Sequence, residues 1–446
     1  MKKAAFALVA TILALSLAGL ASAADATAPG STTMPASANP LAAINAGDVA
    51  WVAAAAALVM LMTPALGFFY GGLVRRKNLV STLTQCFAIF ALVSVVWVLW
   101  GYSLSFSPNG PIVGTLEWAG LNGVGAAPNS YAPTIPALLF MFFQLKFAAI
   151  TPALIIGAFA ERIKFSSLLV FTLLWTTLIY SPVAHWVWGA GGWLKNMGAL
   201  DFAGGTVVHV TAGFSALAAA VVIGRRKTNG EKLLPNNVPY VMLGAALLWF
   251  GWFGFNAGSA LAANAVAVNA LVVTNIAAAT AALSWMLVNW WKEGKPSATG
   301  VAIGAVCGLV AITPASGFVG PLAALVIGAV AGVLSYAVSL WRARKTLLDD
   351  SLDVFACHGA SGVWGALATG IFAQVAINAG GANGLLYGNA GQLGIQLVAV
   401  LAVAAFSFVG TFVVMKFVDA MMGLRVHPHH EEAGLDASQH GEAAYA

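Results

Sequence analysis

Long apolar runs separated by short polar segments make up most of this chain. Eleven of these runs are close to or above the about 20 residues that an α-helix needs to cross a bilayer. They cover residues 48–70, 79–104, 136–158, 165–182, 204–223, 240–261, 265–291, 298–312, 318–341, 352–374 and 391–421. The pattern predicts an all-α membrane protein with eleven transmembrane helices, of which the last is the longest.

The N-terminal segment has a different pattern. Lys2 and Lys3 precede a short apolar run over residues 4–20, and an Ala-Ser-Ala site follows at residues 21–23. This order is typical of a cleaved secretory signal peptide, which we predict over residues 1–23. An uncleaved first membrane span is the alternative. After cleavage the chain would consist of an external tail over 24–47, a transmembrane domain over 48–423 and a cytoplasmic tail over 424–446.

The charged residues support this topology. They make up 8% of the chain, against about 25% in an average soluble domain. With the N-terminus outside, Lys195 is the only Lys or Arg in the external connections between the runs, whereas the cytoplasmic side receives Arg75, Arg76, Lys77, Arg162, Lys164, Arg225, Arg226, Lys227, Lys232, Lys292, Lys295, Arg342, Arg344, Lys345 and Arg425. This asymmetry is what the positive-inside rule requires. It also accounts for the net charge of +5 without a nucleic-acid partner.

Eleven spans divide into five, five and one. Because five is odd, a second five-helix unit would be inverted relative to the first, and such repeats place their substrate site at the repeat interface near the middle of the bilayer. The fifth run carries His209 and the tenth carries His358. We therefore expect an inverted five-plus-five repeat in which these two histidines could meet.

Each histidine follows an aspartate by a few residues, Asp201 in the first case and Asp353 in the second. Histidine can gain or lose a proton near neutral pH, so two of them inside a membrane could bind or relay a proton-carrying substrate. A single histidine in an apolar helix is more often a hydrogen-bonded packing residue. Asp201 could cap a helix or contact the substrate, and Asp353 is expected to be structural.

Aromatic side chains suggest a constriction. Trp252, Phe255 and Ser259 are spaced i, i+3 and i+7, so they share one helical face. Phe147 in the third run could close a narrow path against Phe255. Packing is the ordinary role of such a stripe, whereas the functional interpretation is a pore with an aromatic constriction and a polar mouth. Since burying a small cation without water costs several kcal/mol even after relaxation, such a pore would need to separate a proton from its substrate.

A metal site is the main alternative interpretation of a group of His and Asp residues. No HExxH pairing occurs, and the cysteines have none of the spacings of a zinc or redox motif. Four other histidines lie in the C-terminal tail and the three cysteines lie within apolar runs, namely His427, His429, His430, His440, Cys86, Cys307 and Cys357. We therefore expect no metal site and no cofactor, and we interpret the cysteines as small apolar side chains.

Several segments together are distinctive. They read FAAITPALIIGAFAERIKF, HWVWGAGGWL, GALDFAGGTVVHVTAG, GWFGFNAGSA, AITPASGFVGP and DVFACHGASGVWG. From about residue 48 to the C-terminus the chain resembles the ammonium transporter, methylammonium permease and Rhesus family. The tail GLRVHPHHEEAGLDASQHGEAAY is most similar to the bacterial ammonium transporter branch.

The resemblance implies an architecture and partners. Members of the family are homotrimers with one pore per subunit, built from an inverted five-helix repeat and an eleventh long helix. It implies a multi-pass protein of the bacterial inner membrane that is not an enzyme, with ammonium, ammonia and methylammonium as substrates. A PII-type nitrogen regulatory protein would bind the cytoplasmic face, although topology alone also explains the basic loops there.

The resemblance also implies roles for individual residues. The outer recruitment site and phenylalanine gate of the family match Trp188, Phe147, Phe255 and Ser259. Its external aspartate matches Asp201, its twin pore histidines match His209 and His358, and further pore-lining positions match Trp252 and Thr313. One additional residue separates Trp188 from Asp201 compared with well-known bacterial members. Trp188 and Ser259 together favour an ammonium-recruiting transporter over a Rhesus-like gas channel.

The expected function is ammonium uptake. The outer site recruits NH4+, the ion loses its proton at the gate, and ammonia passes the histidines while the proton is returned or relayed. An ammonium sensor that signals through its cytoplasmic face with little flux is the alternative, although no kinase, cyclase or receiver domain follows the last apolar run.

Overall fold

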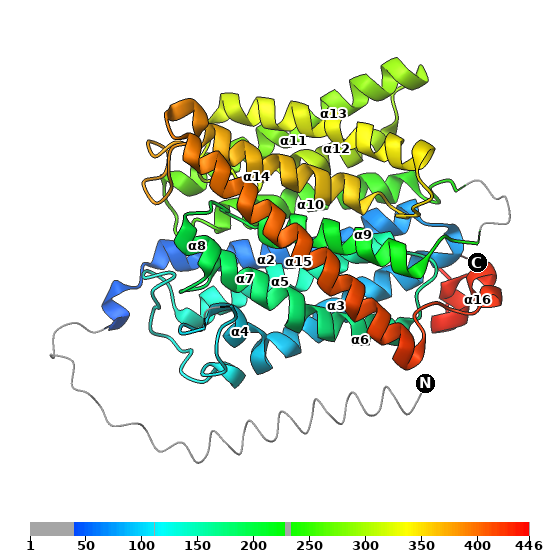
Figure 1. Cartoon of the computed structure of the whole chain (residues 1–446), viewed down its shortest axis with the longest axis horizontal. Coiled ribbons are helices and arrows are strands. Elements are labelled where there is room, and N and C mark those ends of the chain that lie inside the picture. The colour runs from blue at the N-terminus through cyan, green and yellow to red at the C-terminus, as the bar shows by residue number, and fades with distance from the viewer. Residues whose placement is uncertain (1–39, 111, 228–232, 446) are drawn as a thin grey trace, which may run out of the picture.

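The computed structural model describes residues 40–110, 112–227 and 233–445, and these form a helical bundle (Figure 1). The predicted signal peptide and most of the predicted external tail lie outside the described residues. Nine helical stretches within the described residues are long and apolar enough to cross a membrane. They are Ala46–Leu73, Arg76–Phe106, Ala137–Ala158, Phe165–Met197, Gly205–Ile223, Val238–Gly258, Ala265–Glu293, Pro321–Lys345 and Ala390–Met422. The chain is therefore an all-helical, multi-pass membrane protein.

The two other expected spans are helical but fall outside this set. Helix α12 (Ala298–Ile312) has 15 residues. The second begins with the π-helical turn η8 (Phe355–Ala360) and continues as α14 (Ser361–Phe372). This second stretch contains His358 and several glycines at positions where other spans have large apolar side chains. Its mean hydropathy is therefore lower.

The helices run mainly along the long axis of the molecule, and α15 (Ala390–Met422) crosses the others diagonally (Figure 1). Helices α2 (Ala46–Leu73) and α10 (Val238–Gly258) pack against each other extensively. A Cβ atom added to Gly244 would lie 2.3 Å from the backbone nitrogen of Phe69. Small residues allow this close approach of two backbones, which is how helices associate in lipid.

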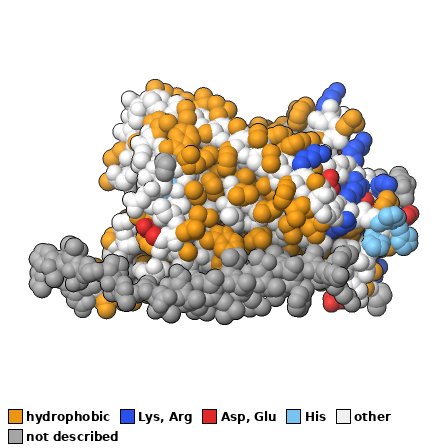
Figure 2. All heavy atoms as spheres, turned by 60° about the horizontal axis from the view of Figure 1, so that its bottom comes forward, with side chains coloured by type: hydrophobic (Ala, Val, Ile, Leu, Met, Phe, Trp, Pro, Cys, Tyr) orange, Lys and Arg blue, Asp and Glu red, His pale blue; other side chains and the backbone are white. Residues whose placement is uncertain are grey.

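Lys and Arg side chains gather at one end of the molecule, and apolar side chains cover its middle (Figure 2). We call this the basic end and define it by Arg75, Arg162 and Arg226, which lie close together: Arg75 and Arg226 both pair with Glu161, and Arg162 and Arg226 both donate to Asp349. Arg226 donates to Asp349 at 2.8 Å and to Glu161 at 3.4 Å. Burial acts to raise the pKa of Asp349, but the hydrogen bonds and charge of Arg226 lower it to about 2. These ion pairs join three connections between helices.

The C-terminal segment folds back onto the basic end, where it forms α16 (Pro428–Ala433) and the turn η10 (Asp436–His440). The backbone nitrogen of Ser81 donates to Asp436 at 2.7 Å. Glu431 is buried and pairs with Arg425 at 2.9 Å. The tail is therefore packed against the helical domain.

Candidate functional site

Two histidines meet at the centre of the bundle. His209 lies on the π-helical turn η7 (Gly205–Val210), which continues as α9 (Thr211–Ile223), and His358 lies on η8. Their Nδ1 atoms are 3.2 Å apart, and both side chains are buried. One neutral imidazole can donate its N–H to the lone pair of the other. The structure thus joins two residues that are 149 positions apart in sequence.

An aspartate caps each of these turns. Asp201 accepts four backbone N–H groups through its two carboxylate oxygens, from Gly204, Gly205, Thr206 and Val207, at 2.7 to 3.0 Å. Burial raises the pKa of Asp201, and the four donors oppose that rise. Because its oxygens face these amides, the geometry favours the helix-cap interpretation over direct contact with a substrate.

The corresponding residue in the second half is Asp350, which the sequence analysis missed. Its carboxylate accepts the backbone N–H of Phe355 at 2.7 Å, and it precedes His358 by eight residues, as Asp201 precedes His209. Asp353 is therefore not the counterpart of Asp201, because its carboxylate accepts a hydrogen bond from Arg342 at 2.6 Å; this contact agrees with the structural role expected of Asp353. Equal spacing to the histidine was the signal that could have identified Asp350.

The two halves approach closely beside the histidines. Gly213 and Gly362 each follow their histidine by four residues. A Cβ atom at Gly213 would lie 2.2 Å from the backbone nitrogen of Gly359, and one at Gly362 would lie 3.2 Å from the Cβ of His209. The absence of a side chain at these positions allows the imidazoles to touch.

Aromatic rings close the space on the other side of His209. The ring centroids of Phe147 on α5 (Ala137–Ile155) and Phe255 on α10 are 4.4 Å apart, and both side chains are fully buried. Trp188, at the end of α7 (Ser181–Trp188), lies 5.9 Å from Phe147 in an edge-on arrangement. The structure therefore brings together the three aromatic residues that sequence placed at the mouth and gate.

Trp188 and Ser259 are the partly exposed members of this group. The Trp188 indole donates to the backbone oxygen of Asp201 at 2.9 Å, and the Ser259 hydroxyl donates to the backbone oxygen of Phe255 at 2.8 Å. Both side chains are thus held in place at the outer edge of the aromatic pair. The oxygen of Ser259 retains the capacity to accept a hydrogen bond.

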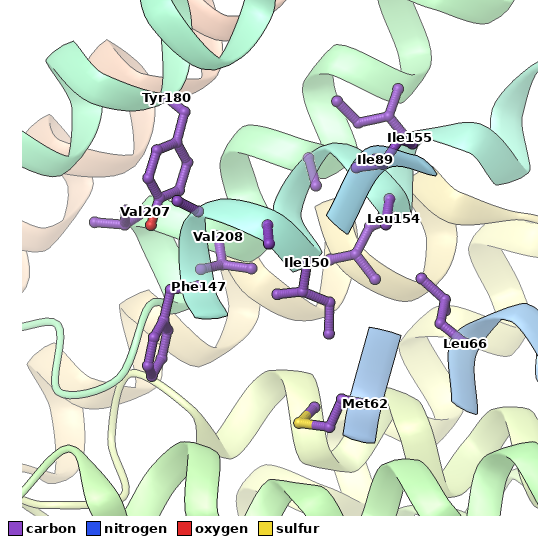
Figure 3. Packing of buried hydrophobic residues seen from close by; sticks show 14 of the residues in the cluster. Met62, Leu66, Ile89, Phe147, Ile150, Leu154, Ile155, Tyr180, Val207 and Val208 are labelled. Carbon is purple, nitrogen blue, oxygen red and sulfur yellow. The ribbon is translucent and has the colours of Figure 1, made fainter. Parts of the chain in front are cut away.

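Below the aromatic pair lies a cavity of 10 Å³, which is about the volume that one water-sized molecule requires. Met62, Leu66, Ile150, Leu154 and Val208 are among its lining residues and are drawn in Figure 3. Among the described residues that line it, only His209, His358 and Trp252 have side-chain nitrogen or oxygen atoms. The cavity is therefore small and mainly apolar.

Hydrogen bonds determine which polar atoms remain available. The indole N–H of Trp252 donates to Thr313 at 2.9 Å, so Trp252 presents its ring to the cavity. The Trp252 and His209 rings stack with centroids 5.4 Å apart. The Nε2 atom of His209 is buried and has no hydrogen-bond partner among the described residues. This atom is able to bind a small polar molecule in the cavity.

Within the described residues, no three His, Cys, Asp or Glu side chains are grouped so that they could hold a metal ion. The site instead combines an aromatic constriction, a small apolar cavity and a pair of imidazoles inside a membrane bundle. These features are those of a membrane transport protein. The chain belongs to the Ammonium Transporter Family, whose model matches residues 50–445.

Known relatives agree with this assignment. The ammonium transporter of Bacillus subtilis is 50% identical over 399 residues, which cover 90% of this chain and 98% of that protein. The ammonium transporter Amt1 of Archaeoglobus fulgidus is 50% identical over 401 residues, covering 90% and 99%. The crystal structure of Candida albicans Mep2 superposes with a TM-score of 0.82 at 37% identity, covering 87% of this chain and 88% of that one. The family expected from the sequence motifs is confirmed.

Proposed function

We propose that this protein takes up ammonium through the path that contains His209 and His358. The observation that carries the proposal is a pair of facing imidazoles in an otherwise apolar cavity below an aromatic gate. Groups that exchange protons near neutral pH suit a substrate that carries one. Membership of the Ammonium Transporter Family supports ammonium as that substrate, with methylammonium as its larger analogue.

Recruitment begins at the outer mouth. The face of an aromatic ring attracts a cation by about 0.5 to 2 kcal/mol, so Trp188 and Phe147 would favour NH4+ over water. Ser259 is held by its bond to Phe255 and would accept a hydrogen bond from the ion. Asp201 supports the mouth indirectly, because it fixes the turn that follows.

Conduction requires the proton to leave. An ammonium-sized ion pays several kcal/mol to enter a dry interior, whereas neutral ammonia pays far less. The Phe147 and Phe255 rings are in contact, with their planes inclined at 42°, and would exclude water, which makes the gate the point of deprotonation. Ammonia then passes Trp252, Thr313 and the two histidines, while the proton is returned outside or relayed through His209 and His358.

The architecture we propose follows the same repeat. Eleven crossings in an inverted five-plus-five arrangement would relate Asp201, His209 and Gly213 to Asp350, His358 and Gly362, with a constant separation of 149 residues. The gathering of cations at the basic end supports a cytoplasmic C-terminus, with the N-terminus outside after removal of residues 1–23. A homotrimer in a bacterial inner membrane, without enzymatic activity, completes the proposal, and a PII-type regulator would bind the basic end.

The test uses purified protein reconstituted in lipid vesicles. We expect saturable uptake of radiolabelled methylammonium, which the double mutant His209→Ala/His358→Ala abolishes or reduces at least about 10-fold because the imidazole pair is lost. The matched control is His429→Ala, an exposed tail histidine. Wild-type rates in the double mutant would exclude a role of the histidines in proton handling.

The same vesicles distinguish the transporter from a sensor. Simultaneous recording of current and counting of uptake shows whether charge accompanies each substrate molecule. A protein that binds a PII-type partner in an ammonium-dependent way, without measurable flux, would contradict uptake and support signalling.

A further inference from the structure

Two cysteines face each other beside the histidine pair. Cys307 lies on α12 and Cys357 on η8, and their Sγ atoms are 3.4 Å apart. Both are free thiols. From the sequence they were interpreted as small apolar side chains, because their spacing matches no zinc or redox motif, and they are 50 residues apart. The tertiary structure makes them a dithiol.

The dithiol lies next to the cavity. Val306 and His358, the chain neighbours of the two cysteines, both line it. Cys357 is 7% exposed and Cys307 is fully buried. A reagent that reaches this pair must therefore be small, and it must be uncharged because the lining is mainly apolar.

The apolar surroundings of the dithiol also limit which complex with a ligand can form there. A buried thiolate without a partner is costly, so the favourable ligand is one that converts two neutral thiols into a neutral complex. A linear two-coordinate soft metal would require the sulfur atoms to move apart. A trivalent arsenic atom bonds two sulfurs at close to a right angle, which leaves those sulfurs almost in contact, as they are here.

We propose that Cys307 and Cys357 form a binding site for trivalent arsenic, supplied as neutral arsenous acid, and that its occupation inhibits transport. Each thiol exchanges its S–H bond for an S–As bond and displaces one hydroxyl group from arsenic. Two thiols and As(OH)3 thus give a dithioarsenite that keeps one hydroxyl group, and two waters leave. Arsenic remains trivalent, so no oxidant or reductant is needed.

Inhibition of transport follows from the position of the bound arsenic. The arsenic atom and its hydroxyl group would lie beside His358, where they add a rigid link between α12 and η8. This half of the proposal rests on the transport function proposed above, whereas binding to the dithiol does not. The two halves have separate readouts.

Binding is tested on the reduced, purified full-length protein with sodium arsenite as the probe, by intact-mass spectrometry. We expect one arsenic per chain in the wild type and in Cys86→Ser, which removes the third buried cysteine. Loss of either partner leaves only single-thiol attachment, so Cys307→Ser and Cys357→Ser should weaken binding by about 100-fold or more. Cys307→Ala and Cys357→Ala serve as second variants if a serine variant does not fold.

Equal binding of arsenic by any well-folded single-thiol variant, or no binding by the reduced wild type, would overturn the site.

Inhibition is measured as methylammonium uptake relative to the untreated rate of each variant. We expect arsenite to inhibit the wild type and Cys86→Ser, and a dithiol such as 2,3-dimercaptopropanol to restore uptake. Unchanged uptake by arsenic-loaded wild type would overturn the inhibitory half, while an untreated protein without uptake would contradict the proposed function instead.

Discussion

His209 and His358 share one hydrogen bond across the centre of the molecule, with 3.2 Å between their Nδ1 atoms. The hydrogen bond makes the two imidazoles one unit, so the loss of either ring leaves the other without this partner. The Nε2 atom of His209 remains for a ligand.

The two histidines are expected to be energetically coupled. His209→Ala and His358→Ala should each lower methylammonium uptake, and the double mutant should lose less than the product of the single losses, by a factor of about 2 to about 100. The measurement is initial uptake in vesicles at equal protein density. Combining His209→Ala with His429→Ala serves as the control and should give independent effects; strict independence of the two pore histidines would refute the coupling.

Asp350 and not Asp353 is expected to support the second histidine. Asp350→Ala removes the acceptor for the Phe355 N–H, which should lower stability by about 1–3 kcal/mol and reduce uptake. The control is Asp353→Asn, since asparagine tolerates the positive φ of 55° at that position. Because the Asp353 side chain is 28% exposed, its loss should cost about 1 kcal/mol or less. Thermal unfolding in detergent separates the two, and equal losses would argue against the assignment.

Gly213 is expected to tolerate no side chain. Its Cβ would meet the Gly359 backbone at 2.2 Å, so Gly213→Ala should lower the free energy of unfolding by about 1–3 kcal/mol and separate the imidazoles. Gly394→Ala is the control, because nothing lies within 4 Å of its Cβ and it is inside helix α15. That change should leave stability unchanged or raise it by up to about 1 kcal/mol. A melting temperature for Gly213→Ala at or above the wild-type value contradicts the close packing.

The basic end is expected to weaken in acid. The pKa of Asp349 is lowered from 3.8 to about 2, by Arg226 acting against burial, so the folded state binds this proton less tightly than the unfolded state. Its contribution is complete above pH 3.8 and is lost as the pH falls to about 2. Asp349→Asn should therefore destabilise by on the order of 1 kcal/mol at neutral pH, and the difference should vanish in acid. Glu117→Gln, at an exposed position, is the control and should leave the stability at neutral pH unchanged.

Sequence reasoning worked best where a single segment contains the whole signal. Apolar runs predict membrane helices because a backbone in lipid must satisfy its own hydrogen bonds. The spacing of Trp252, Phe255 and Ser259 predicted a common face, and the structure places the Trp252 and Phe255 rings against His209. Sequence reasoning was less effective for the helix caps. Asp350 and Asp353 both precede His358, and only the directions of their side chains show which of the two caps the turn.

The sequence by itself determined the membrane class, the family and which side chains are available, because hydropathy, charge asymmetry and local motifs are properties of contiguous residues. Only the tertiary structure decided that His209 contacts His358, that the Phe147 ring lies against Phe255 and that Cys307 faces Cys357. Each of these contacts joins helices far apart in the chain. Their distances depend on how closely backbones pack at positions such as Gly213 and Gly362, and no local pattern specifies that packing.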